Sequence, residues 1–154
     1  FDDTRLDQYT SAIPIMEKHQ FKGAFYIMTV AIGKPGYMSK EQIADLHQKG
    51  HSIGSHTWDH QNVKKLTGKD WDTQITKPSS QLETITGEPI GDFAYPFGLW
   101  NKEAIPELKK RGIKLAFQLS DARDNDDPLH SVRRIIVPGT MSGASLIKSM
   151  KTNF

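Results

Sequence analysis

The sequence predicts an α/β fold in which helices cover a largely parallel β-sheet. Short apolar segments typical of buried strands alternate along the chain with longer segments that have helical periodicity. This alternation is typical of successive β-α-β units, in either an open sheet or a barrel. The 154 residues suffice for one apolar core and are few for two, so we expect a single domain over residues 1–154.

The first half of the chain contains two predicted helix–strand pairs. Pro14 is compatible with the first helix only near its first turn, because proline lacks a backbone N–H. Ser39 is a favourable N-cap for the second helix, and Gly50 suits its C-terminal end. The elements expected here are a helix over Tyr9–His19, a strand over Gly23–Val30, a helix between Ser39 and Gly50, and a strand over His51–Ser55.

The second half continues the alternation and then becomes less regular. A helical stretch lies between Trp71 and Thr86, and Pro78 must kink or divide it. The elements expected after it are a strand over Asp92–Tyr95, a helix over Lys102–Arg111, a strand over Ile113–Gln118, an acidic loop over Asp121–Pro128, a strand over Arg134–Val137 and a last helix over Ser142–Lys151.

Composition excludes several classes of protein and of site. A net charge of +2 and mixed acids and bases give no support for a nucleic-acid partner. No apolar run approaches the roughly 20 residues that a membrane span needs, and no signal segment opens the chain. Cysteine is absent, so a transition-metal site must use histidine and carboxylate ligands. The chain opens on Phe1-Asp2-Asp3 without a preceding strand, and we expect that an N-terminal part has been removed.

His56 and His60 are four residues apart, at the end of a predicted strand. On one helical turn this spacing brings two imidazoles to the same face, which suits two metal ligands. The alternative is a polar helix start, because surface histidines often fall at such spacing.

The adjacent carboxylates of Asp2 and Asp3 admit a catalytic and a structural interpretation. Adjacent acids usually belong to a turn or a helix entry. On an extended backbone, however, they point to opposite sides, so one can bind a metal while the other acts as a base. Asp3 with His56 and His60 makes a ligand set of two histidines and one carboxylate, which leaves positions open for water and substrate. Such a set suits hydrolysis.

The segment Phe93-Ala94-Tyr95-Pro96-Phe97-Gly98 is predicted to be a strand that ends in a turn, with Gly98 free to adopt unusual backbone angles. A simple loop is one interpretation. The other is functional, because a rigid turn of proline, an aromatic residue and glycine can direct a backbone N–H at an oxyanion and offer aromatic walls to a sugar ring.

Three segments together resemble the polysaccharide deacetylase family, also called the NodB-homology or carbohydrate esterase family 4. Phe1-Asp2-Asp3-Thr4 resembles its first motif, which usually ends in glycine; GHSIGSHTWDH, from Gly50 to His60, closely resembles the second; and Phe93 to Gly98 resembles the third. Order and spacing also match, and the resemblance extends to about Val137. It implies a distorted, incomplete (β/α) barrel.

The resemblance also implies roles for individual residues. Asp2 would be the general base, Asp3, His56 and His60 would hold one divalent metal ion, and the backbone N–H of Phe97 would help to form an oxyanion hole. We expect zinc, although cobalt, nickel or iron suit the same ligands. The implied reaction releases acetate from an N-acetylglucosamine polysaccharide such as poly-N-acetylglucosamine, chitin oligomers or peptidoglycan. An extracellular or cell-surface location is expected.

Two departures from the family pattern affect the catalytic residues. Ala94 stands where many members have an arginine that orients the catalytic aspartate, and this is similar to the branch that deacetylates poly-N-acetylglucosamine. Arg134 resembles a late arginine of that branch and is a candidate for the orienting role, the alternative being an exposed strand charge. The histidine that the family uses as general acid is missing after His130, so His130 is a candidate by elimination, the alternative being a loop residue.

Several aromatic residues are candidates for a sugar cleft, although large aromatics more often belong to a core. They are Trp58, Tyr95 with the adjacent Pro96, and Trp100. Two rival functions remain open. One is an O-acetyl esterase that acts on xylan. The other is a non-catalytic sugar-binding module, suggested by the missing histidine and by Ala94.

Overall fold

Five short strands form one parallel sheet in the order β1-β2-β3-β4-β5. The computed structural model describes residues 1–119 and 122–153. The strands are β1 (Ala24–Ile27), β2 (Ser52–Ser55), β3 (Asp92–Ala94), β4 (Leu115–Gln118) and β5 (Val132–Arg133). Every ladder is parallel, so the predicted α/β class is confirmed.

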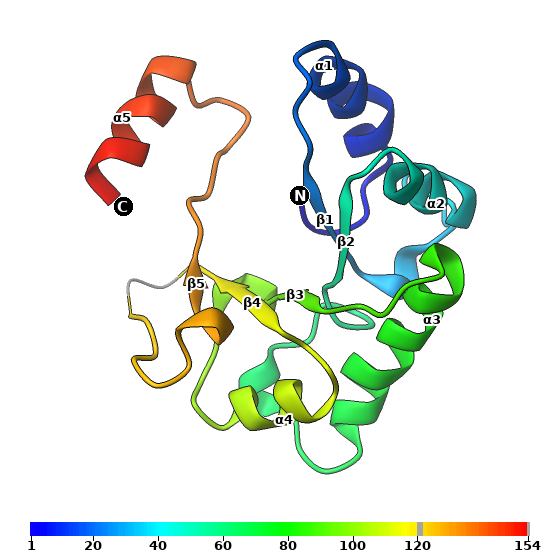
Figure 1. Ribbon diagram of the computed structural model, residues 1–154, viewed down its shortest axis with the longest axis vertical. Helices are drawn as coiled ribbons and strands as arrows, with labels where there is room; N and C mark the ends of the chain where they lie inside the picture. Colours follow the sequence, from blue (N-terminus) through cyan, green and yellow to red (C-terminus); the bar gives the residue numbers. More distant parts are fainter. Residues whose placement is uncertain (120–121, 154) are drawn as a thin grey trace.

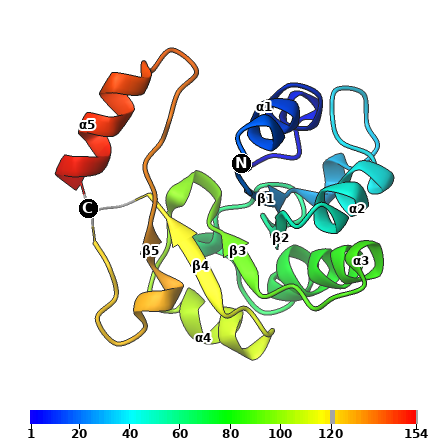
Figure 2. The same cartoon turned by 45° about the horizontal axis from the view of Figure 1, so that its top comes forward.

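The helices follow the connections between strands. They are α1 (Ile13–Lys18), α2 (Lys40–Gln48), α3 (Lys77–Thr86), α4 (Ala104–Lys110) and α5 (Gly143–Asn153). Right-handed connections that advance in one direction place their helices on one side of a sheet, and Figure 2 shows α1 to α4 in order around that side. No described helix is long and apolar enough to span a membrane.

Short helical segments complete the fold. Two are π-helices, η1 (Gln8–Ala12) and η4 (Asp72–Thr76), and four are 3-10 turns, η2 (Thr29–Ala31), η3 (Val63–Lys65), η5 (Pro96–Gly98) and η6 (Pro128–His130). The strand expected over Gly23–Val30 is therefore shorter, because the chain turns into η2 after β1.

Pro14 and Pro78 occupy equivalent positions in their helices. Pro14 and Pro78 each lie in the first turn of an α-helix, and a π-helix, η1 or η4, directly precedes each of these helices. Proline has no N–H to donate and its ring clashes with the carbonyl four residues earlier. The wider π-turn accommodates this defect without ending the helix.

The capping expected for α2 is present. The Ser39 hydroxyl accepts from the N–H of Gln42, and the Gln42 side chain accepts from the N–H of Ser39, which completes a capping box. Gly50 then has a φ of 81°, the left-handed conformation that glycine adopts readily.

The sheet is curved, so that strands distant in the order approach each other. The rings of Tyr26 in β1 and Phe117 in β4 lie 5.5 Å apart although these strands are not neighbours. Asp2 adds a parallel bridge to β1 at Tyr26, and Arg134, directly after β5, reaches Asp2 with two hydrogen bonds of 2.8 Å. The two edges of the sheet thus meet at one end, as in the expected incomplete barrel.

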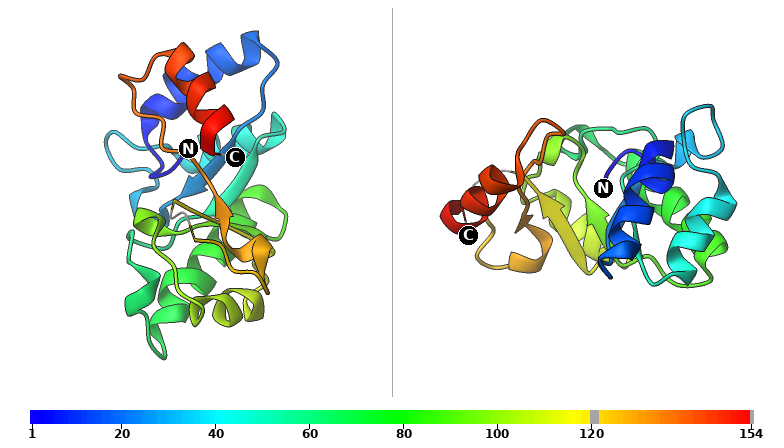
Figure 3. Two further views of the ribbon diagram at one scale, coloured as in Figure 1. Left: turned by 90° about the vertical axis from the view of Figure 1, so that its left-hand side faces the viewer. Right: turned by 90° about the horizontal axis from the view of Figure 1, so that it is seen from above.

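Two apolar clusters stabilise this arrangement. One joins β1 and β2 to the helices around them through Phe25, Ile27, Ile43, Leu46 and Leu82. The other joins β3 and β4 to α4 and η4 through Phe93, Tyr95, Ile75, Leu108 and Ala116. Helix α5 follows an extended segment and lies away from α1 to α4 (Figures 1 and 3).

One element expected near the end of the chain differs from prediction. The strand expected over Arg134–Val137 is wrong: β5 is Val132–Arg133, and only the N–H of Arg134 continues its pairing, by donating to Gln118. In the expected acidic loop, Asp121 lies outside the described residues. Asp124 is buried there and accepts from the N–H groups of Asp126 and Asp127, so one of its acids organises the loop.

Candidate metal centre

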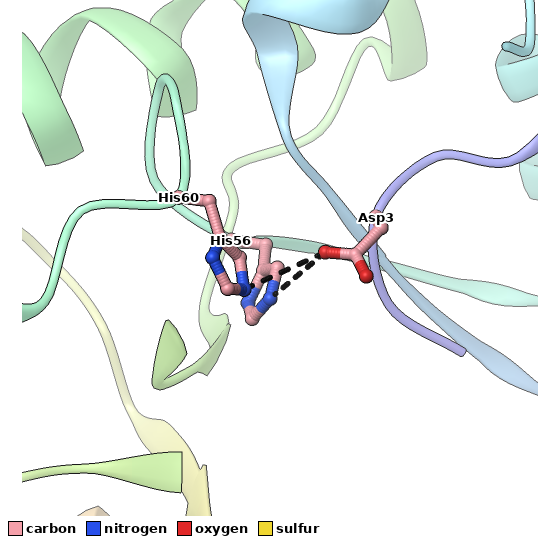
Figure 4. Close-up of side chains that lie close together, drawn as sticks. All are labelled: Asp3, His56 and His60. Atoms are coloured by element: carbon pink, nitrogen blue, oxygen red, sulfur yellow. Dashed lines mark ion pairs between the residues drawn. The ribbon is translucent and has the colours of Figure 1, made fainter. Parts of the chain in front are cut away.

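Three predicted ligands, Asp3, His56 and His60, come together at the carboxyl ends of the strands. Asp3 follows the residue that bridges to β1, and His56 directly follows β2. Figure 4 shows the Asp3 carboxylate facing both imidazole rings. Its Oδ1 lies 3.5 Å from Nε2 of His56 and 3.6 Å from Nε2 of His60.

These distances fit a metal ion. One ligand atom from each of the three residues lies within 4.8 Å of the others. Zinc binds histidine nitrogen or carboxylate oxygen at about 2.0–2.1 Å, so two ligands at a tetrahedral angle are about 3.4 Å apart. The carboxylate–imidazole separations are close to that value, and the ligand set is one that divalent transition metals accept.

His56 is held in the orientation that a ligand needs. Its side chain is buried, and its Nδ1 lies 2.7 Å from the carbonyl oxygen of Ala94, the last residue of β3. A carbonyl only accepts, so Nδ1 carries the proton and the lone pair of Nε2 faces Asp3. A bond of this kind to the second ring nitrogen is typical of metal-binding histidines.

The segment between the two histidines is a turn and not the expected helical turn. Thr57 and His60 have φ values of 65° and 67°, which a right-handed helix excludes. The backbone N–H of Val30, in η2, donates to the carbonyl of Trp58 at 2.9 Å and fixes the turn against the end of β1. The chain therefore reverses here and brings His60 back beside His56.

The first motif is also strained. Asp3 and Thr4 have φ values of 73° and 64°, and the latter is unusual for a β-branched residue. The buried Thr4 hydroxyl compensates, because it accepts from the N–H of Met28 at 2.8 Å. Of the described non-glycine residues with positive φ, only Gln20 lies outside the three predicted motifs. Such strain concentrates at functional sites.

Asp2 lies beside the ligand set and is paired with Arg134. The guanidinium donates to both carboxylate oxygens and also lies over the ring of Tyr26, 5.3 Å from its centroid. Burial would raise the pKa of Asp2, but Arg134 and His56 together hold it below the ordinary value. Asp2 is therefore ionised at neutral pH, with Oδ2 3.9 Å from Nε2 of His56.

The remaining ligands are also in their metal-binding protonation states. The neighbouring imidazole of His56 lowers the pKa of Asp3. Burial, together with the nearby His56, lowers the pKa of His60. A deprotonated carboxylate and a neutral imidazole are the forms that bind a metal.

The third motif forms η5 next to these ligands. Phe97 has a φ of 60°, and its exposed ring contacts His60 edge-on with centroids 4.3 Å apart. Gly98 is required by space, because a Cβ at this position would meet the Cβ of Leu119 at 2.4 Å.

Comparison with known proteins decides the family. The family model for polysaccharide deacetylases matches residues 1–116, three quarters of the chain. The chain belongs to the polysaccharide deacetylase family. The resemblance of the three motifs is thereby confirmed.

Two curated relatives and one solved structure illustrate the similarity. A chitooligosaccharide deacetylase of Azorhizobium caulinodans is 29% identical over 133 residues, which cover 83% of this chain and 60% of that protein. A poly-beta-1,6-N-acetyl-D-glucosamine N-deacetylase of Staphylococcus aureus (strain MRSA252) is 26% identical over 135 residues, covering 79% of this chain and 47% of that protein. The chain thus spans about half the length of such relatives.

The solved structure shows the same fold. The deacetylase PplD of Streptococcus pyogenes, in complex with acetate, superposes with a TM-score of 0.88 at 24% identity, over 97% of this chain and 68% of that one. Within this family fold, Asp2, Asp3, His56, His60, Phe97 and Arg134 gather at one site, whereas other predicted residues do not.

His130 is far from this site, which contradicts its expected role as general acid. It is buried in η6, and its Nε2 lies 3.0 Å from the carbonyl oxygen of Ile113. Ile113 precedes β4, so this contact is at the amino end of the sheet, opposite the metal ligands.

The predicted sugar-binding residues differ in exposure. Tyr95 is fully buried and its hydroxyl donates to the carbonyl of His130, so it is a core residue and its prediction as a substrate contact is wrong. Pro96 is buried as well, and Trp100 packs against the second apolar cluster. Trp58 has 41% of its surface exposed and remains the candidate for a sugar contact.

A hollow of about 580 Å³ borders Asp2 and its partner Arg134. It is lined by Phe1, Asp2, Asp3, Leu119, Arg134 and the apolar segment 135–137. Sequence reasoning missed this wall, because it assigned 135–137 to a strand. It also missed the carbonyl of Ala94, which holds His56, since a backbone acceptor leaves no mark on the residue type.

Proposed function

We propose that this chain hydrolyses N-acetyl groups of an N-acetylglucosamine polysaccharide in a metal-dependent reaction that releases acetate. Membership of the polysaccharide deacetylase family gives the reaction class. The observation that carries the finer proposal is the carboxylate of Asp2, paired with Arg134, beside the cluster of Asp3, His56 and His60.

We propose zinc as the ion, with cobalt, nickel or iron as alternatives. Asp3, His56 and His60 would hold it through one oxygen and two Nε2 atoms. When bound, the ion would polarise the acyl carbonyl and lower the pKa of a bound water towards roughly 7.

The roles of the chain's own residues follow from their positions. Asp2 accepts the proton of the attacking water, because it is ionised and lies next to the ligand set. Arg134 orients that carboxylate with two parallel bonds. The backbone N–H of Phe97 is proposed as a donor to the oxyanion, since its turn contacts His60.

Protonation of the departing amine has no assigned residue once His130 is removed from the site. Two alternative functions therefore stay open. An O-acetyl esterase that acts on xylan would use the same attack with a different leaving group. A sugar-binding module would use the cleft without turnover.

The proposed substrates are poly-N-acetylglucosamine, chitin oligomers or peptidoglycan, and the proposed location is extracellular or at the cell surface, where such polymers occur. Trp58 supports a polysaccharide ligand. Its exposed ring borders a hollow whose other walls include Thr29, Lys77 and Pro78, and an aromatic wall of this kind can stack against a sugar ring.

An acetate-release assay tests the proposal. The wild type and Asp2→Asn are compared on chitin oligomers, poly-N-acetylglucosamine, peptidoglycan and acetylated xylan, each with added zinc or with a chelator. We expect zinc-dependent release from an N-acetylated polymer and almost none from Asp2→Asn. Release from xylan alone would favour the esterase, oligosaccharide binding without release would favour the binding module, and full activity of Asp2→Asn would refute the base assignment.

A further inference from the structure

Gln74 holds the turn that carries the metal ligands, although it lies outside all three motifs. We propose that Gln74 is a positioning residue for the metal centre and acts through Trp58 and Asp59. The inference rests on the metal centre described under Proposed function.

Gln74 makes two hydrogen bonds to the middle of the turn between His56 and His60. The Gln74 side-chain oxygen accepts from the backbone N–H of Trp58 at 3.2 Å, and its amide nitrogen donates to Oδ1 of Asp59 at 2.9 Å. Gln74 itself is only 6% exposed. A buried amide with both ends bonded fixes its partners firmly, because neither group can exchange to water.

These hydrogen bonds matter more for the position of His60 than for that of His56. His56 is fully buried and held by Ala94. The side chain of His60 is 29% exposed, and its backbone has a φ of 67°. The position of His60 therefore depends on the backbone of residues 57–59, which Val30 holds from one side and Gln74 from the other.

The sequence explains why Gln74 faces the turn. It is the middle residue of the π-helix η4, in which the N–H of Lys77 donates to the carbonyl of Asp72 five residues earlier. The π-helix directly precedes α3, whose second residue is Pro78, and it changes the direction in which side chains leave the helix. Proline at 78 thus contributes to the metal site through Gln74.

A reciprocal exchange gives a sharp test. In Gln74→Glu two carboxylates face each other at Asp59, and the donor is lost. In Asp59→Asn the new amide can turn its oxygen to the Gln74 donor, so the bond survives. In the double variant Gln74→Glu/Asp59→Asn the donor and acceptor have changed places, while Trp58 keeps its acceptor.

Zinc affinity measured by calorimetry, beside a thermal melt, is the readout. Loss of a residue that orients ligands typically weakens metal binding about 10- to 100-fold, and we expect this for Gln74→Glu and Gln74→Met. We expect Asp59→Asn and the double variant to bind zinc within about threefold of the wild type. Gln118→Met is the control, because Gln118 is equally buried but bonds to Ala122 and Ser131; it should lower stability without lowering zinc affinity.

Each result decides between the two proposals. Zinc binding by the wild type with unchanged affinity in Gln74→Met overturns the role of Gln74 alone. A double variant whose zinc affinity is as low as that of Gln74→Glu also overturns it, since exchanging the donor and the acceptor then fails to restore metal binding. A wild type that binds no zinc overturns the metal centre and this inference together.

Discussion

Replacing Arg134 with methionine should lower kcat/KM by an amount that can be estimated from its two hydrogen bonds to Asp2. The side chains of Asp2 and Arg134 are 28% and 20% exposed, so water screens their pair only in part. Their two bonds of 2.8 Å are charge-assisted, and a hydrogen bond to a charged group contributes roughly 1.5–3 kcal/mol. If the transition state loses the contribution of one such bond, kcat/KM falls roughly 10- to 150-fold, and the loss of both would lower it further.

The pH profile should move in a predicted direction. Arg134 and His56 hold the pKa of Asp2 below its ordinary value of 3.8 against the opposing effect of burial. Without the guanidinium, burial acts with less opposition and the pKa rises. Asp2 then becomes protonated at a higher pH, so the acid limb of kcat/KM shifts upwards. Arg134→Lys keeps the charge but not the paired geometry, and should lie between the wild type and Arg134→Met.

The assay is acetate release from the polymer that gives the highest activity, measured across pH with saturating zinc. Arg133→Met is the matched control, because it removes a neighbouring positive charge from β5 without touching the two bonds to Asp2. An Arg134→Met enzyme with kcat/KM within twofold of the wild type and an unmoved acid limb would refute the orienting role.

Three other predictions concern stability and metal binding. Gly87→Ala, at positive φ but in open space, should cost roughly 1–2 kcal/mol in urea unfolding, because an L side chain disfavours the left-handed conformation. Gly98→Ala, also at positive φ, should cost roughly 1–3 kcal/mol more, because its Cβ would overlap Leu119; equal costs would contradict the steric argument. His60→Ala should weaken zinc binding by more than the roughly 100-fold of an orienting residue, as calorimetry would show, and an unchanged affinity would remove His60 from the site. The folded pKa of Asp2 is lowered, so the stability that its carboxylate contributes is present above pH 3.8 and is lost as pH falls through the folded pKa. Between pH 6 and 2 the melting temperature of Asp2→Asn should therefore fall less steeply than that of the wild type. Parallel falls would contradict this linkage.

The fold was predictable because its signals are local. The capping box at Ser39, the glycine at 50 and the prolines at 14 and 78 fix helix ends through backbone chemistry that depends on neighbouring residues. The end of the chain lacked such signals. The apolar run 135–137 has strand composition, yet the ladder with β4 ends at Arg134, and only the partner strand determines where pairing stops.

The sequence predicted which residues cluster at the site, but not the geometry that brings them together. Asp3, His56 and His60 carry metal-binding chemistry in their residue types, but the turn between the histidines was expected to be helical. Its positive φ values depend on bonds from η2 and from η4, which are remote in sequence. The sequence also could not place His130. A histidine is a suitable general acid, but His130 is buried at the amino end of β4, away from the site.

The pairing of Asp2 with Arg134 links the proposed catalytic base to the shape of the sheet. These residues are 132 positions apart in the sequence, and each lies at one edge of the curved sheet. An arginine within the third motif would orient the aspartate from β3, in the middle of the sheet, whereas Arg134 does so from the end of β5, across the open side of the barrel. The same interaction therefore joins the two edges of the sheet and orients the proposed base. A change that opens the sheet at β5 should lower catalysis before it lowers metal affinity. The proposed metal ligands Asp3, His56 and His60 lie on the side of β1 and β2 and do not depend on β5.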